Sequence, residues 1–259
     1  MLITSLFHFC SLVLVILFCM AYSVSSLVSQ SSSTSGTLTV IGFGSLMSEE
    51  SSRGTFPKLR NFRYARVEGW RRVMRHPASI FFERGIANLE TKEMSSLSAE
   101  PYEGEGFVVC VFDVDQPSQE EMEEFRKREE EFELVPASFT ELDSGITGSG
   151  LICSASTDAA FIERWGQDTF DAKYVSYGIH SIWDDWGTDS GIRPCPVYLR
   201  HCVLATSKEG VDSRARDSFL DETFLADRKT TVRRYLESDL GAHVMSSEPP
   251  QSLIGRYSG

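Results

Sequence analysis

Apolar residues in the first half of the chain form short runs whose spacing predicts strands. Residues 37–41 are rich in β-branched side chains and predict a buried strand that ends at a glycine. Residues 107–114 are apolar at nearly every position, which is typical of a central strand buried on both faces. Residues 65–74 alternate around Gly69 and predict two strand segments joined at a turn or bulge. Two shorter strands are expected within residues 79–89 and 95–100.

A helix is predicted after Pro117. Ser118 and Glu121 have the spacing of a capping box, in which each residue's side chain binds the backbone N–H of the other. The helical pattern continues to about Phe132 and is charged on nearly every face.

Glu129 is the candidate general base in this helix. The apolar positions are Met122, Phe125 and Phe132, and position 129 would complete their stripe. A carboxylate in such a stripe faces the core or a cleft, where burial raises its pKa towards neutrality. That pKa suits a base that works near pH 7. The alternative is that Glu129 only pairs with Arg126 or with a basic residue of a strand.

The second half of the chain is less regular. Residues 144–150 have the glycine and serine content of a flexible loop or lid. Residues 196–205 are interpreted as a strand with a polar break, and residues 213–240 as helical with Gly241 as the C-cap. The tail over residues 246–259 is predicted to be flexible.

The N-terminal stretch predicts a targeting signal. It is apolar and uncharged, and small residues follow it, so residues 1–26 are interpreted as a secretory signal peptide. No Lys or Arg precedes the apolar run, which leaves an uncleaved membrane anchor as the alternative. Residues 27–36 are Ser/Thr-rich and predict a linker. The expected location is the secretory pathway or an organelle lumen.

Charge and residue composition exclude some classes of binding partner. The chain of 259 residues has a net charge of −12, which argues against nucleic acid as a partner. No Cys-x-x-Cys occurs, and His180 with Asp184 and Asp185 matches no metal-ligand spacing, so no metal site is predicted. In an oxidising compartment Cys195 and Cys202 can pair, and in a reducing one they are buried thiols. The sequence does not specify an oligomeric state.

A glycine-rich corner follows the first strand. The sequence is Ile41-Gly42-Phe43-Gly44-Ser45-Leu46, and glycines there allow a sharp bend and a close approach of the backbone to a ligand. Successive N–H groups in such a turn form a small anion-binding concavity. The simpler interpretation is a tight turn that only requires a positive φ.

Three segments together resemble the γ-glutamyl cyclotransferase superfamily, in particular its ChaC-like and plant avirulence-induced-like branches. They are residues 41–46, residues 67–72, and Arg128-Glu129 followed by Phe132. In the family these correspond to the Y-G-S-L turn, a strand of the form G-[YW]-x-R, and the R-E region. Phe43 stands where the family has Tyr, and the glycine-rich segment after the acid is absent. Glu129 is preferred to Glu130 because of the Arg-Glu match and the helix stripe.

The resemblance implies an α+β fold, a small mixed β-barrel with flanking helices, over residues 37–245 with an insertion at about 140–193. It implies an enzyme that releases 5-oxoproline from glutathione or another γ-glutamyl amine by intramolecular aminolysis. Glu129 would be the catalytic acid–base, and Ile41, Gly42, Phe43, Gly44, Ser45 and Leu46 would bind this small-molecule substrate, without a cofactor. The alternatives are a non-catalytic binding module on the same fold and an amide hydrolase.

Overall fold

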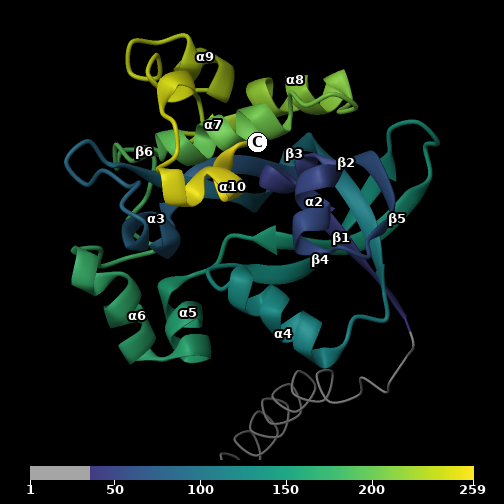
Figure 1. Ribbon diagram of the computed structural model, residues 1–259, viewed down its shortest axis with the longest axis horizontal. Helices are drawn as coiled ribbons and strands as arrows, with labels where there is room; N and C mark the ends of the chain where they lie inside the picture. The colour runs from purple at the N-terminus through teal and green to yellow at the C-terminus, as the bar shows by residue number, and fades with distance from the viewer. Residues whose placement is uncertain (1–35) are drawn as a thin grey trace, which may run out of the picture. The chain divides into compact units, whose positions relative to one another are not determined.

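A closed barrel of five strands forms the centre of the protein, which a computed structural model describes over residues 36–259. The ring runs β3-β1-β5-β4-β2 and returns to β3. β1 and β5 are parallel, and the other pairs that close the ring are antiparallel. The strands are β1 (Thr37–Gly42), β2 (Arg60–Pro77), β3 (Glu93–Asp115), β4 (Glu133–Glu141) and β5 (Thr147–Ser154). The expected α+β fold with a small mixed barrel is therefore confirmed (Figure 1).

The long hairpin of β2 and β3 carries the barrel. Ala65 lies opposite Val109, and the register shifts between Glu68 and Trp70, where Gly69 adopts a positive φ of 78°. The predicted bulge at this glycine is confirmed. The strand over residues 107–112 is fully buried or nearly so, as its continuous apolar run predicted.

Helices cover the outside of the barrel (Figure 1). The first five in chain order are α2 (Glu49–Thr55), α3 (Ser79–Glu83), α4 (Gln119–Arg128), α5 (Asp158–Trp165) and α6 (Gln167–Lys173). The remainder are α7 (Pro196–Ala205), α8 (Ser213–Asp221), α9 (Val232–Leu236) and α10 (Ile254–Tyr257). Short strands β6 (Arg193–Pro194) and β7 (Thr223–Leu225) extend the sheet at its two ends. Four 3₁₀ turns complete the described part: η1 (Ser45–Met47), η2 (Val175–Tyr177), η3 (Val244–Ser246) and η4 (Gln251–Leu253).

Two apolar clusters stabilise the region around the site. The larger one joins barrel residues such as Ile41 and Val109 to Leu199 of α7 and Phe219 of α8. The second joins Phe132 and Trp183 to the buried side chains of α5 and α6. Burial of each large apolar side chain contributes about 1.5–3 kcal/mol, so the two clusters fix the elements that surround the site.

Several predicted elements are wrong in type. Residues 79–83 form helix α3, and residues 196–205 form helix α7, where strands were expected. Pro196 occupies the first turn of α7, a position that suits proline because its missing N–H has no partner there anyway. Residues 213–240 contain β7 between α8 and α9, so this stretch is not one helix.

The expected insertion and lid are also corrected. β5 begins within residues 144–150 and pairs with β4 along its whole length, so this part belongs to the barrel. Residues 155–192, which include α5 and α6, follow β5 and lie outside the barrel.

The tail predicted to be flexible instead packs on the domain. Leu253 and Tyr257 are 5% and 4% exposed and join a cluster with Phe81 of α3 and Val197 of α7. These two apolar residues lie four positions apart, so one turn of helix brings both to the same face.

The N-terminal predictions fall on residues that the structure does not describe: the signal peptide over 1–26 and almost all of the linker over 27–36. Within residues 36–259, no helix has both the length and the apolar character that a membrane span requires. The four cysteines of this part, Cys110, Cys153, Cys195 and Cys202, are free thiols, so Cys195 and Cys202 do not form the disulfide that was considered.

Candidate active site

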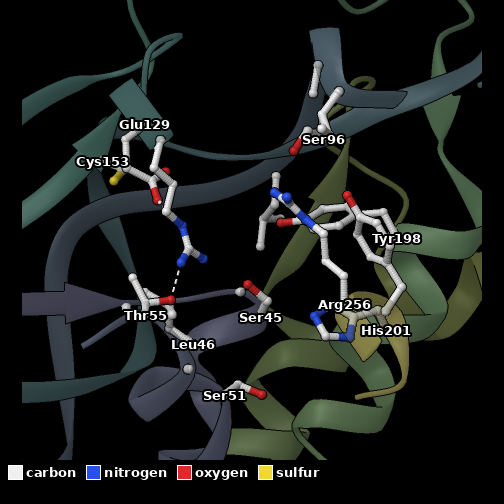
Figure 2. Close-up of a pocket in the computed structure, with 18 of the residues that line it drawn as sticks. Ser45, Leu46, Ser51, Thr55, Ser96, Glu129, Cys153, Tyr198, His201 and Arg256 are labelled. Atoms are coloured by element: carbon white, nitrogen blue, oxygen red, sulfur yellow. Dashed lines mark hydrogen bonds and ion pairs between the residues drawn. The ribbon is translucent and has the colours of Figure 1, made fainter. Parts of the chain in front are cut away.

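One cavity of about 720 Å³ brings together the glycine corner, the acidic run and the C-terminal segment. Residues 41–46 line it, as do Glu129, Tyr198, His201 and Arg256. Figure 2 shows Glu129 beside Cys153 at one side, Tyr198, His201 and Arg256 at the other, and Ser45 and Leu46 between them. The structure thus places every predicted site residue at the same cavity.

Close packing, and not a positive φ, explains the two glycines of the corner. Neither Gly42 nor Gly44 has a positive φ, so the tight-turn interpretation is wrong. A Cβ on Gly42 would lie 2.8 Å from both the Sγ of Cys110 and the Cβ of Leu46. At Gly44 it would lie 3.1 Å from Leu97 and 3.3 Å from the Tyr198 hydroxyl. The backbone therefore runs against its neighbours at both positions.

The carbonyl groups of the corner are bonded within the protein, whereas several of its N–H groups are not. Arg72 donates to the carbonyl of Phe43 at 3.0 Å, and Met47 N donates to that of Gly44 at 3.1 Å. Ser52 donates to the carbonyl of Leu46 at 2.7 Å. Within residues 36–259, the N–H groups of Gly44, Ser45 and Leu46 donate to no protein acceptor. These donors are available to a ligand in the cavity.

Arg72 is the buried residue that holds the corner in place. It is fully buried and also donates to Thr223 Oγ1 at 2.7 Å, while its guanidinium lies 4.8 Å from the Phe107 ring centroid. Desolvation by burial lowers the pKa of Arg72 to about 9, so the side chain is still protonated at neutral pH. Arg72 does not line the cavity, and supports the corner from beneath it.

Glu129 lies just past the end of α4. The helix ends at Arg128, earlier than predicted, and Glu129 is its C-cap with φ −101° and ψ 35°. The predicted capping box at Ser118 and Glu121 is confirmed. Glu129 therefore reaches the cavity from a turn, and not as part of an apolar helix stripe.

Burial sets the protonation of Glu129. Its side chain is 16% exposed and forms an ion pair with Arg128 at 3.2 Å, and the Cys153 thiol is a hydrogen-bond partner. Desolvation raises the pKa of Glu129 above its ordinary value, and outweighs the opposite effects of Arg128 and Cys153. A carboxyl group with a raised pKa facing a cavity is what proton transfer near neutral pH requires.

The next two acids have different surroundings. Glu130 pairs with Lys173 at 2.6 Å. Glu131 accepts hydrogen bonds from Ser79 N at 3.0 Å and from the Tyr174 hydroxyl at 2.6 Å, and burial raises its pKa to about 7. Two tryptophan side chains hold the backbone of these acids in place. The indoles of Trp165 and Trp183 donate to the backbone carbonyls of Glu130 and Glu131.

The wall opposite Glu129 was not found from the sequence. Tyr198 and His201 lie on α7, where the sequence predicts a strand, and Arg256 lies in the segment that the sequence predicts to be flexible. His201 accepts a hydrogen bond from Gly259 N at 2.9 Å, and burial lowers its pKa to about 4, so it is neutral at pH 7. Pro196 as a helix start, and Leu253 and Tyr257 at helical spacing, are the signals that would have located this wall.

No group of three or more His, Cys, Asp or Glu within residues 36–259 is arranged to hold a metal ion.

No protein-family model matches this sequence, and no curated protein matches it. Among solved structures, an uncharacterized protein from Homo sapiens aligns over 82% of this chain and 99% of its own, with 9% identity and a TM-score of 0.45. A structure entitled gamma-glutamyl cyclotransferase aligns over the same shares with 9% identity and a TM-score of 0.43. A γ-glutamyl cyclotransferase specific to glutathione from yeast aligns over 70% of this chain and 95% of its own, with 13% identity and a TM-score of 0.40.

This chain is therefore similar in structure to proteins that include γ-glutamyl cyclotransferases. Identities of 9–13% leave its substrate and its activity to be argued from its own residues.

Proposed function

We propose that this protein is a γ-glutamyl cyclotransferase-like enzyme that releases 5-oxoproline from glutathione or another γ-glutamyl amine. The observation that carries the proposal is the shared cavity, in which a carboxyl group with a raised pKa lies with the unbonded N–H groups of the corner. The resemblance of residues 41–46 and of Arg128-Glu129 to the family's motifs supplies the reaction class.

The reaction is an intramolecular aminolysis. The α-amine nitrogen of the γ-glutamyl group forms a bond to its own γ-carbonyl carbon, and the bond from that carbon to the leaving nitrogen breaks. The α-amine is protonated at pH 7, so a base must remove a proton before attack. The α-nitrogen loses two protons in all, one before attack and one after it. Glu129 accepts each in turn and passes both to the leaving nitrogen, which departs as an ammonium ion while Glu129 returns to its carboxylate form. Protons and charge therefore balance without a further reactant.

The corner stabilises the charge that develops. As the amine attacks, negative charge grows on the γ-carbonyl oxygen, and fixed N–H donors stabilise it best when they need no rearrangement. The N–H groups of Gly44, Ser45 and Leu46 suit this role, or suit the α-carboxylate of the substrate. Arg72 and Ser52 hold the corner's carbonyls, so these donors are set in place before the substrate binds.

The substrate supplies both the nucleophile and the electrophile. The enzyme therefore gains most by holding the γ-glutamyl chain in its cyclic shape, since orientation alone can contribute about 7–11 kcal/mol to a well-placed intramolecular step. Phe43, which forms an edge-to-face contact with Phe107 at 6.0 Å, offers an apolar surface to the methylene groups of that chain.

Replacement of Glu129 tests the assignment of the base. We expect Glu129→Gln to lower kcat for 5-oxoproline release by about 10²- to 10⁴-fold, because the amide cannot accept the proton. Binding of a γ-glutamyl compound, measured by calorimetry, should survive. The matched control is Glu124→Gln on the exposed face of α4, where the carboxylate only pairs with Lys127.

Two outcomes would redirect the proposal. Loss of activity in Glu131→Gln with full activity in Glu129→Gln would assign the base to Glu131, whose pKa is also raised. Free glutamate in place of 5-oxoproline would indicate hydrolysis by water. A protein that binds γ-glutamyl compounds but releases neither product would be a binding module.

We also propose that residues 1–26 direct the chain into the secretory pathway or an organelle lumen. Mass spectrometry of the mature protein should find an N-terminus near residues 21–26. A full-length chain that stays with the membrane fraction would instead indicate the uncleaved anchor.

A further inference from the structure

Arg256 differs from the other cations that line the cavity. Lysines and arginines at the cavity wall form ion pairs with carboxylates of the protein: Lys127 with Glu124, Arg128 with Glu129, Lys173 with Glu130, and Lys208 with Glu50. Arg256 has no carboxylate within 4.0 Å among residues 36–259. Its guanidinium lies over the Tyr257 ring, 5.7 Å from the centroid. An exposed arginine without an acidic partner is ordinary on a surface, but here it lies at the wall of the site.

Helix α10 positions this residue. Leu253 and Tyr257, on either side of it, are buried against α3 and α7, and the Tyr257 ring lies edge-on to His201 at 5.5 Å. The hydrogen bond from Gly259 N to His201 holds the segment beyond it. Figure 2 shows Arg256 with Tyr198 and His201, across the cavity from Glu129 and Cys153. The positive charge of Arg256 nevertheless acts on Glu129, where it opposes part of the rise in pKa that burial causes.

The reaction fixes which part of a substrate reaches this wall. The α-amine must approach Glu129, and the γ-carbonyl must approach the corner. The leaving amine then extends away from Glu129, towards α7 and α10. A cavity of about 720 Å³ has room for more than a γ-glutamyl group, because cavities of ~300–1,000 Å³ hold drug-sized ligands.

We propose that Arg256 is a specificity-determining residue that binds a carboxylate on the leaving amine. A guanidinium matches a carboxylate with two parallel N–H···O bonds, and pairs with it more strongly than with a neutral group. The enzyme then favours γ-glutamyl amino acids and peptides over γ-glutamyl amines that lack this carboxylate. The inference rests on the proposed function, and names the chemical feature by which the site selects its substrate.

Two substrates that differ only in this carboxylate provide the test: γ-glutamyl-alanine and γ-glutamyl-ethylamine. We expect the wild-type protein to have a kcat/KM about 10- to 100-fold higher for γ-glutamyl-alanine, as one charge-assisted contact provides. Arg256→Gln should reduce the ratio of kcat/KM for γ-glutamyl-alanine to that for γ-glutamyl-ethylamine to about one. An effect of the lost charge on Glu129 changes both values alike and cancels in this ratio. Arg256→Lys should retain part of the preference, because lysine keeps the positive charge but lacks the two parallel N–H donors of a guanidinium.

The matched control is Arg216→Gln, which removes an exposed cation on α8 outside the cavity, and it should leave the preference intact. Equal kcat/KM values for the two substrates in the wild-type protein would overturn the inference. An equal loss on both substrates in Arg256→Gln would also overturn it, since both retain the α-carboxylate of the glutamyl group.

Binding separates failure of this inference from failure of the proposed function. Calorimetry with Glu129→Gln measures the affinity of both compounds without turnover, in the presence and absence of Arg256→Gln. If neither compound yields 5-oxoproline, the proposed function fails. A higher affinity for γ-glutamyl-alanine that Arg256→Gln abolishes would still support the role of Arg256. The same affinity for both compounds, with and without Arg256→Gln, would overturn it.

Discussion

Three consecutive glutamates show how strongly a residue's surroundings decide its chemistry. Glu129 faces the cavity beside Arg128, Glu130 pairs with Lys173, and Glu131 is bonded to Ser79 and Tyr174. All three have the same intrinsic acidity, so the differences in their chemistry come from burial and partners alone. Burial raises the pKa of both Glu129 and Glu131, and only the structure shows that they have different partners.

Glu131 should make stability depend on pH in a defined window. Its pKa rises from 4.5 in the unfolded chain to about 7 in the folded protein, so between these values the folded state binds the proton more tightly. This contribution is full below pH 4.5 and is lost as the pH rises to about 7. Relative to Glu131→Gln, the wild-type free energy of unfolding should fall by on the order of 1–3 kcal/mol across this window.

Denaturant unfolding of both proteins at several pH values from 4.5 to 8 checks this expectation. The amide of Glu131→Gln still accepts hydrogen bonds from Ser79 and Tyr174, so the comparison isolates the proton. Parallel curves for the two proteins would contradict it. The depressed pKa of His201 acts in the opposite direction in both proteins and cancels in the difference. His76, whose Nε2 lies 4.0 Å from Glu131 Oε2, responds to the substitution and is part of the difference.

At the scale of elements, the corner depends on the absence of two side chains. A Cβ at Gly42 would press on Cys110 and Leu46, and this overpacking typically costs about 1–3 kcal/mol. We therefore expect Gly42→Ala to lower the free energy of unfolding by that amount, and to reduce activity because the donors of the corner move.

Gly54→Ala is the matched control for stability, because a Cβ at Gly54 in α2 would meet nothing within 4 Å. It should stabilise the protein by about 0.5–1 kcal/mol, since alanine favours a helix more than glycine does. Equal effects of the two substitutions on thermal unfolding would show that the corner is not tightly packed.

Elements with strong local signals were predicted correctly from the sequence. β1, the central part of β3, the bulge at Gly69 and the capping box of α4 each follow from a pattern of adjacent residues. The helices α3 and α10 were missed because they have only five and four residues. α7 was missed because its buried residues lie on several sides of the helix and show no clear helical stripe. In such segments tertiary packing decides between helix and strand.

At the scale of the whole molecule, the barrel brings distant parts of the chain to one cavity. The corner, Glu129, α7 and α10 lie far apart in the sequence, the corner and α10 by more than two hundred residues, and they meet there. The sequence motifs located the first two, because glycines and acids are conspicuous. They did not locate His201 or Arg256, because a lone cation or histidine gives no signal until the fold shows what it faces.

Hydrogen exchange can show whether the corner and the C-terminal segment bind the same ligand. A γ-glutamyl compound bound to Glu129→Gln should slow exchange of the amides at residues 44–46 and at residues 253–257 together. Residues 158–165 of α5, which do not line the cavity, serve as the internal reference. Protection of the corner without protection of α10 would show that the C-terminal segment takes no part in binding.

Release of 5-oxoproline is the most direct test of the account. The purified wild-type protein and Glu129→Gln are incubated with glutathione and a panel of γ-glutamyl amino acids and amines, and the products are identified by mass. We expect the wild-type protein to release the lactam and the amine in equal amounts from at least one donor, and the variant to be slower by at least about 10²-fold. No lactam from any donor, or equal release by both proteins, would contradict it.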